Sequence, residues 1–390
     1  MSRQRPKQVA VAIPIAVPWM AECLGGILEY AREHGGWNVL TSPPTLIGAM
    51  ELTLTAASLR GWPGDGVIAF INNRKEASDA KRLGIPVVTL GGVLCDPSLP
   101  RVMVDHYAIG RVAADHLLQC GFRRLAFYGI RGPWYARQRR QGFVDRAAEA
   151  NVACHVLEQV PSSNPRTSWR QRLAPLDKWL RSLKLPAGIM AVHDYRARIL
   201  LEECLRLELH VPHDVAIVGV DNDTTVCEHC QPALSSVSRN SWTNGYEAAL
   251  LLGRLMAGET PQCQEIILPP DGVVARRSTD TIAVDDPYVS AVVHYMHDHL
   301  AEISQVTDAL TQVSVSRRFL EQRFLASINC TPYHYLCGLR VERAKRMLMS
   351  PERPKMHAVA RACGFPSTDR MRLVFLRHMG KTPSEFRQHG

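Results

Sequence analysis

The sequence predicts an α/β body of two lobes, each built on a parallel sheet, followed by a smaller all-α module. Three observations predict this fold class. From residue 8 to residue 278, short apolar segments alternate with amphipathic helical segments. After residue 287 the strand signals stop and only helical patterns follow. The charge changes near the same point, because residues 1–310 carry 31 Lys and Arg against 32 Asp and Glu, whereas residues 311–390 carry 15 against 5.

Composition excludes several classes of protein. With 46% hydrophobic and 21% charged residues, the chain has an ordinary globular composition rather than a disordered one. No segment reaches the ~18 apolar residues that a membrane-spanning helix needs. The eleven cysteines are scattered and odd in number, which favours reduced thiols in a cytoplasmic protein over a disulfide framework.

The apolar segments of the body are mostly continuous aliphatic or β-branched runs, as expected of strands buried on both faces of a parallel sheet. These predicted strands are Val9–Val17, Gly66–Phe70, Pro86–Gly91, Arg124–Tyr128, Gly188–Val192 and Val215–Val220. The clearest helical segments between them are Ala108–Cys120, Gln138–Ala150 and Arg196–Leu207. The predicted domains are a two-lobed body at 1–278, a polar linker at 279–286 and a helical domain at 287–390.

Polar residues follow several predicted strands. Asp221, the His193–Asp194 pair and Asp105 each come directly after an apolar run, and Arg137 lies just past the run that begins at Arg124. Ligands of open parallel sheets bind at the carboxyl ends of the strands, so these residues are candidates for a polar ligand site. The alternative is that each caps the next helix, for which Asp is well suited.

The helical module contains two helix-turn-helix patterns, the first with its second helix starting at Ser316. Leu320 and Phe324 form the apolar stripe of that helix, and its predicted DNA-facing residues are Ser316, Arg317, Arg318, Glu321 and Gln322. In the second pattern the turn is 364–366, the apolar face is Met371, Val374 and Phe375, and the predicted DNA-facing residues are Ser367, Thr368, Asp369 and Arg372. Two such patterns in tandem, in the basic part of the chain, predict major-groove recognition of double-stranded DNA.

The module resembles the AraC/XylS family of transcription regulators. The resemblance is carried by SRRFLEQRF at 316–324, LRVERAKRML at 339–348, ARACGFPS at 360–367 and GKTPSEFR at 380–387. It implies two recognition helices that enter successive major grooves on one face of the DNA. The chain departs from the family at Ser314, where a turn glycine is expected, and at Arg370–Met371, where an aromatic pair is expected.

The body resembles the sugar-sensing core of the LacI/GalR repressors and of periplasmic sugar-binding proteins. The matching segments are 104–117, ARQRRQGF at 136–143, MAVHD at 190–194 and VGVDN at 218–222. The resemblance implies that Arg137 and Asp221 bind sugar hydroxyls, and that His193, Asp194 and Asp105 lie in the same site. An arginine and a carboxylate suit this task, since one donates and the other accepts paired hydrogen bonds.

An aromatic ring that covers the apolar face of a sugar is expected from Trp19 or Trp134, with core packing as the alternative role for both. Cys227 and Cys230 have metal-like spacing, but no further ligands complete four, so no metal is expected. No cofactor motif and no nucleophile–base pair is recognisable, so no enzyme is predicted.

The sequence therefore predicts a cytoplasmic, homodimeric transcription regulator, an activator that responds to a monosaccharide effector and works with RNA polymerase. A sugar-transport binding protein is the alternative, and a sugar-processing enzyme is a more distant third.

Overall fold

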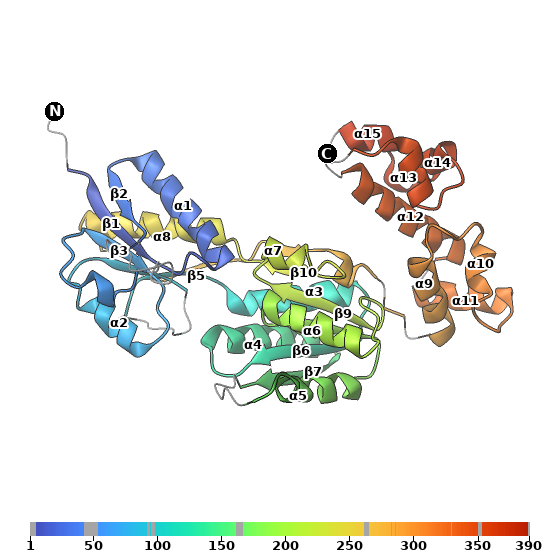
Figure 1. The fold of residues 1–390 in the computed structure, drawn as a ribbon, viewed down its shortest axis with the longest axis horizontal. Helices are drawn as coiled ribbons and strands as arrows, with labels where there is room; N and C mark the ends of the chain where they lie inside the picture. Colours follow the sequence, from blue (N-terminus) through green and yellow to red (C-terminus); the bar gives the residue numbers. More distant parts are fainter. Residues whose placement is uncertain are drawn as a thin grey trace. The chain divides into compact units, whose positions relative to one another are not determined.

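A computed structural model describes residues 5–42, 54–91, 94, 98–160, 167–260, 265–281, 283–284, 286–328, 330–349 and 353–388. Its contacts divide the chain into two compact units, Met1–Thr281 and Ile282–Gly390, which we call the α/β unit and the helical unit. The division falls within the predicted linker at 279–286. Figure 1 labels helices and strands of each unit.

The first lobe of the α/β unit has a parallel six-stranded sheet in the order β11-β5-β4-β3-β1-β2. Its strands are β1 (Lys7–Ala12), β2 (Trp37–Leu40), β3 (Gly66–Ala69), β4 (Val87–Leu90), β5 (Arg101–Val104) and β11 (Glu265–Leu268), and its helices are α1 (Pro18–His34), α2 (Arg74–Lys81) and α8 (Ser241–Met256). Helices α1 and α8 lie side by side although they are far apart in sequence (Figure 1).

The second lobe has the sheet order β12-β10-β9-β8-β6-β7, in which only the β10–β12 pair is antiparallel. Its strands are β6 (Arg124–Ile130), β7 (Ala153–Gln159), β8 (Ala187–Ala191), β9 (Val215–Val220), β10 (Ser235–Ser238) and β12 (Gly272–Val274), and its helices are α3 (His106–Gln119), α4 (Trp134–Glu149), α5 (Trp169–Ser182), α6 (Asp194–Arg206) and α7 (Thr224–Cys227). The chain crosses between the lobes after β5, β10 and β11. These crossings bring residues such as Asp105 and Arg239 to the junction of the lobes.

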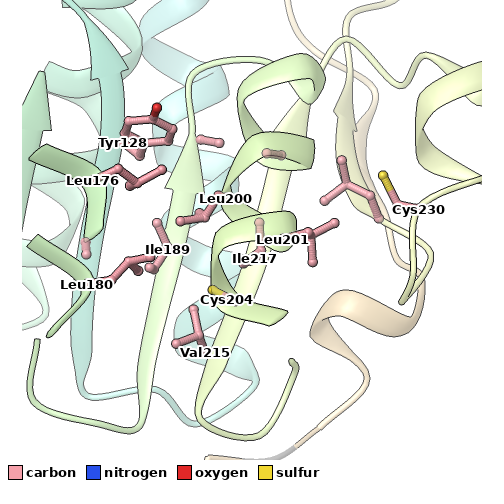
Figure 2. Close-up of a cluster of buried hydrophobic side chains, with 14 of the residues drawn as sticks. Tyr128, Leu176, Leu180, Ile189, Leu200, Leu201, Cys204, Val215, Ile217 and Cys230 are labelled. Carbon is pink, nitrogen blue, oxygen red and sulfur yellow. The ribbon is translucent and has the colours of Figure 1, made fainter. Parts of the chain in front are cut away.

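Aliphatic side chains from the strands and helices of the second lobe form one of its cores. Leu200 and Leu201 of α6 pack over Ile189 and Ile217 of the sheet, as Figure 2 shows, and all four are nearly or fully buried. The first lobe has a core on each face of its sheet. Burial on both faces is what the continuous apolar runs predict for parallel strands.

The predicted α/β class with a helical domain is confirmed, and one predicted strand is too long. The run Val9–Val17 forms a strand only as far as Ala12, and Val17 already caps α1. Pro14 lacks an N–H for the sheet, and Pro18 takes the first turn of the helix, where a missing N–H is tolerated. The run therefore joins a buried strand to the start of a helix.

The helical unit contains α9 (Pro287–Asp298), α10 (Val306–Leu310), α11 (Arg317–Ile328), α12 (Pro332–Leu348), α13 (Met356–Ala362), α14 (Thr368–Met379) and α15 (Pro383–Gln388). Its described residues form two separate apolar cores. One is formed by α9, α10, α11 and the start of α12, and the other by the rest of α12 with α13, α14 and Phe386 of α15. The helices predicted from Ser316 and after the turn at 364–366 are present as α11 and α14, whereas α15 was not predicted.

Candidate functional site

Asp221 is the centre of a charged network in the α/β unit. It follows β9 directly, and its backbone has a φ of 105°, which few non-glycine residues adopt. Its Oδ1 accepts hydrogen bonds from Arg139 at 3.3 Å and from Arg239 at 3.2 Å. Two guanidinium groups therefore converge on one carboxylate oxygen at the end of a parallel strand.

Arg139 is a buried residue of α4, with 1% of its side chain exposed. It donates hydrogen bonds to the Val192 carbonyl, to Nδ1 of His106 at 3.3 Å and to Asp221. Burial lowers the pKa of Arg139, and the Asp221 carboxylate opposes that shift. The network holds a cation inside the lobe by giving it three acceptors.

Close packing of α3 on α4 positions Arg139. A Cβ at Gly110 would lie 2.1 Å from the carbonyl oxygen of Arg139, and one at Gly142 would lie 2.0 Å from that of Tyr107. Only glycine permits the two helix backbones to approach this closely. The guanidinium of Arg139 also lies over the ring of Tyr135, with 5.1 Å to the ring centroid.

Arg137 is placed differently, on the exposed side of α4. The contacts with Asp221 in the described part of the chain are made by Arg139 and Arg239, not by Arg137. The structure thus brings Asp221 together with an arginine two positions after the predicted one.

Arg239 connects Asp221 to Trp19. Its guanidinium carbon lies 3.9 Å from the ring centroid of Trp19, which is on α1 in the first lobe. Trp19 also contacts the Phe70 ring edge-on at 6.0 Å between centroids. A small pocket beside this pair is lined by Leu90, Val104 and Ser241, among others. One arginine therefore contacts both a carboxylate of the second lobe and an aromatic ring of the first.

His193 and Asp194 begin α6 and have different surroundings. His193 caps the helix, because its Nδ1 accepts a hydrogen bond from the Arg196 backbone N–H at 3.2 Å. Burial lowers the pKa of His193 to about 4, with Asp221 opposing the shift and Arg139 adding to it. The imidazole is therefore neutral near pH 7.

Asp194 is buried, with 1% exposure, and both its oxygens are occupied. They accept from the Asp223 backbone N–H at 2.8 Å and from the Ser236 hydroxyl at 2.6 Å. Burial, and after it the charge of Asp221, raise the pKa of Asp194 to about 7, although the hydrogen bonds to its carboxylate lower it. Asp194 ties the ends of β9, β10 and α6 together beneath Asp221.

Asp105 caps α3 at the crossing between the lobes, where its side chain accepts from the Ala108 N–H at 2.8 Å. This is the capping role given as the alternative in the sequence analysis. Trp134 at the start of α4 contacts the ring of His106 edge-on, with 5.6 Å between centroids. His106 itself is buried, and burial holds its pKa well below the usual range.

Arg139, Arg239, Tyr135 and His106 were not among the predicted site residues. A signal for Arg139 was present, because Ala136, Arg139 and Phe143 are spaced as the buried stripe of a helix and all three are buried. An arginine on an apolar stripe needs a buried partner, which Asp221 supplies here.

In the helical unit, α11 has the amphipathic division that the sequence predicts. Leu320 and Phe324 are fully buried, and the Ser316 hydroxyl accepts from the Phe319 N–H at 3.3 Å. Arg317 pairs with Glu321 at 2.8 Å. Among the predicted DNA-facing residues, Ser316, Arg317, Arg318 and Gln322 are exposed and Glu321 is partly exposed.

The α14 helix repeats this arrangement. Ser367 caps it by accepting from the Arg370 N–H at 3.1 Å, and Met371, Val374 and Phe375 are buried. Arg370 donates a hydrogen bond to the Tyr333 hydroxyl of α12. Of the predicted DNA-facing residues, Ser367, Asp369 and Arg372 are exposed and Thr368 is partly exposed.

Among the described residues, no helix combines the length and the hydropathy that a membrane-spanning segment needs. No group of three or more His, Cys, Asp or Glu side chains is assembled there for a metal ion, and Cys227 and Cys230 are free, buried thiols.

Known families match each part of the chain. Residues 10–167 match the model of periplasmic binding proteins and the sugar binding domain of the LacI family. Residues 114–279 match a periplasmic binding protein-like domain, and residues 310–389 match a helix-turn-helix domain.

Similar proteins extend over most of the chain. The xylose operon regulatory protein of Escherichia coli K12 is 32% identical over 339 residues, covering 84% of this chain and 85% of that protein. The protein of the same name from Haemophilus influenzae is 31% identical over 332 residues, covering 83% of this chain and 84% of that protein. The solved structure of the xylose-binding transcription activator xylR matches with a TM-score of 0.77 and 28% identity, covering all of both chains.

Proposed function

This chain belongs to the family of the xylose operon regulatory proteins, a sugar-responsive and DNA-binding class of transcription regulator, and from that premise we propose that its effector is xylose. We further propose that it is a cytoplasmic homodimer that activates a sugar-utilisation operon together with RNA polymerase. The alternative of a sugar-transport binding protein is not favoured, because the helix-turn-helix match occupies the C-terminal part of the chain.

One observation carries the proposed sugar site: a carboxylate at a strand end is paired with two arginines, one of which covers a tryptophan ring. Asp221 and Arg139 supply an acceptor and a donor for neighbouring sugar hydroxyls. Trp19 supplies a flat apolar surface for the sugar ring on the face that the Arg239 guanidinium does not cover. In this proposal Arg139 takes the place that the sequence analysis gave to Arg137.

The other predicted sugar ligands keep a place in the proposal according to their contacts. His193 is neutral near pH 7 and lies close enough to Asp221 for its pKa to depend on that carboxylate, so it is proposed as a further ligand. Sugar contacts by Asp105 and Asp194 stay predictions, since the described hydrogen bonds use their carboxylates to cap α3 and to join strand ends.

The helices α11 and α14 are proposed to enter successive major grooves. Each presents exposed polar residues on one face and a buried apolar stripe on the other, as a recognition helix requires. Sugar can change DNA binding only if it binds one arrangement of the regulator more tightly than another. The sugar-dependent change is therefore proposed to be in the arrangement of the dimer.

A thermal-shift screen of the full chain against xylose, arabinose, ribose and glucose tests the effector. A ligand at ~100 times its Kd stabilises the folded state by ~2.7 kcal/mol, so xylose should raise the Tm more than the other three sugars at equal concentration. Asp221→Asn is the matched variant and should show a smaller shift than the wild-type protein. A larger shift with another sugar would reassign the effector, and no shift with any of them would contradict a monosaccharide effector.

A further inference from the structure

The α12 helix belongs to both cores of the helical unit. Tyr335 and Leu336 near its start pack in the core with α9, α10 and α11. Val341 and Ala344, one turn later, pack in the core with α13 and α14. Arg340 lies where the helix passes from one core to the other. Any side chain that contacts both sides of this position affects how the two helix-turn-helix patterns are placed within the unit.

Arg340 makes such contacts. It is 6% exposed, and its Nη2 donates a hydrogen bond of 2.5 Å to the carbonyl oxygen of Ile303, which packs in the first core. Its guanidinium carbon lies 5.8 Å from the ring centroid of Phe365, which packs in the second core. One side chain therefore joins the segment after α9 to the turn before α14.

The backbones of the two parts also touch beside Arg340. Gly364 has a φ of +75°, and a Cβ there would lie 2.3 Å from the carbonyl oxygen of Leu300 and 3.2 Å from Nε of Arg340. Gly364 is in the turn of the second pattern, whereas Leu300 belongs to the first core. The approach is too close for a side chain, so the two parts meet in a tight seam, which we define as Leu300, Ile303, Arg340, Gly364 and Phe365.

Burying the charged side chain of Arg340 in this seam costs desolvation free energy. No carboxylate among the described ion pairs contacts Arg340, and its Nε has no hydrogen-bond partner in the described structure. Burial correspondingly lowers the pKa of Arg340. A buried cation without an anionic partner contributes little stability, and an apolar residue of similar volume often stabilises more. Compared with an apolar residue, Arg340 adds a directional contact to each of the two cores.

We propose that Arg340 is a positioning residue that fixes the spacing and orientation of α11 relative to α14. The proposal rests on the proposed function, in which both helices contact DNA. Two binding elements held rigidly at the separation of two grooves bind as one, because the second contact forms without a further search. Loosening the seam should reduce this advantage while leaving each helix able to bind its own groove.

The spacing of the DNA segments is the readout. A duplex selected from a randomised pool by the full-length wild-type protein with xylose is footprinted, and one base pair is then inserted between the two protected segments. An insertion rotates one segment by about a tenth of a helical turn against the other. The wild-type protein should lose about tenfold or more in affinity on insertion, whereas Arg340→Met should lose less than about threefold.

Two further variants separate positioning from folding and charge. Arg361→Met removes one positive charge from an exposed site on α13 and should keep the wild-type sensitivity to insertion. Gly364→Ala disturbs the same seam without touching charge and should reduce that sensitivity, which keeps the test decisive if Arg340→Met fails to fold.

The outcomes distinguish this proposal from the proposed function. If the wild-type footprint covers two grooves and both Arg340→Met and Gly364→Ala keep the wild-type insertion penalty, the positioning role is overturned and Arg340 serves stability alone. A footprint over one groove would also overturn it, while DNA binding by the regulator stands. If the wild-type protein selects no duplex from the pool, the proposed function itself fails.

Discussion

The α/β unit and the helical unit place their candidate functional groups in opposite surroundings. In the α/β unit, Arg139 and Arg239 have 1% and 10% of their side chains exposed, and both pair with Asp221. In the helical unit, Arg317 and Arg318 are exposed to solvent on α11. A small neutral ligand is selected by fixed, dehydrated polar groups, whereas a polyanion is attracted by solvated cations. The two kinds of site should therefore respond differently to mutation, salt and pH.

The largest expected effect concerns the assignment of DNA binding to one unit. Removing the basic C-terminal part should abolish binding, so the fragment 1–280 should show no binding to DNA that the full chain binds. For the full chain, log K should fall with log salt at ~0.9 per phosphate contact. Filter binding across a salt series measures both. A fragment that binds as tightly as the full chain would place the DNA site in the α/β unit.

Next in size is the effect of Asp194 on the pH dependence of stability. Its pKa of about 7 when folded lies above the ordinary 3.8, so its contribution to stability falls as pH rises from about 4 to about 7. His193 acts in the opposite direction, because its folded pKa of about 4 lies below 6.5 and its contribution falls as pH drops from 6.5 to 4. The two contributions partly cancel in the wild-type protein.

Asp194→Asn should leave the contribution of His193 to the pH dependence of stability uncancelled. Between pH 4.5 and 6.5 the free energy of unfolding of the variant should rise by about 2–3 kcal/mol more than that of the wild-type protein. Urea unfolding at the two pH values measures this difference. Parallel profiles for the two proteins would mean that Asp194 is ionised in the folded state throughout this range.

A smaller effect is expected when the sugar network loses its carboxylate. Asp221→Asn leaves Arg139 and Arg239 without their anion, and an unsatisfied buried partner costs ~1–3 kcal/mol, or about 5- to 150-fold in affinity for xylose. Calorimetry of the full chain measures this loss. Asp177→Asn, which alters the ion pairs of a partly exposed carboxylate of α5 with Arg181 and Arg206, is the control and should bind sugar normally. Unchanged affinity in Asp221→Asn would move the sugar site elsewhere.

Among the exposed residues of the helical unit, at least one of Arg317 and Arg318 should contact a base. Arg317 pairs with Glu321 on the described surface, whereas none of the described ion pairs includes Arg318. Arg318→Ala should cost ~1–2 kcal/mol and relax base preference at one position, as loss of a base contact does. Binding of both alanine variants to a set of single-base operator variants measures this. A uniform loss across the set for both would make the two arginines phosphate contacts.

The contrast between the units also explains what could be predicted from the sequence. Periodicity located α11 and α14 and their buried faces, because Leu320, Phe324, Met371 and Phe375 repeat with the period of a helix. The positions between these apolar residues form the exposed polar face, so that face could be predicted as well. Asp221 could be predicted because it directly follows an apolar run that forms a strand.

The partners of Arg139 and Arg239 could not be predicted in this way, although the helical period of α4 indicates that Arg139 is buried. The segment ARQRRQGF contains three arginines, and the phase of α4 decides which one enters the lobe, but that phase does not name Asp221 as its partner. Arg239 reaches Trp19 because the chain crosses between the lobes after β10, a topological fact that the local sequence does not contain. The contacts of Arg340 with Ile303 and Phe365 likewise depend on how distant segments fold together, which the local sequence does not contain.

The smallest expected effect decides between two neighbouring arginines. Arg137 is exposed on α4, so Arg137→Ala removes no buried contact and should change the affinity for xylose by less than about threefold, as surface substitutions usually do. Arg139→Ala, by contrast, removes the donor to Asp221, the Val192 carbonyl and His106, and should weaken xylose binding at least as much as Asp221→Asn. Calorimetry on both variants, with the Tm of each as a check on folding, separates the residue that the family resemblance suggests from the residue that the fold brings to Asp221. If Arg137→Ala loses xylose binding and Arg139→Ala keeps it, the bound site uses the exposed arginine, and Arg139 serves to hold the network of the unliganded lobe.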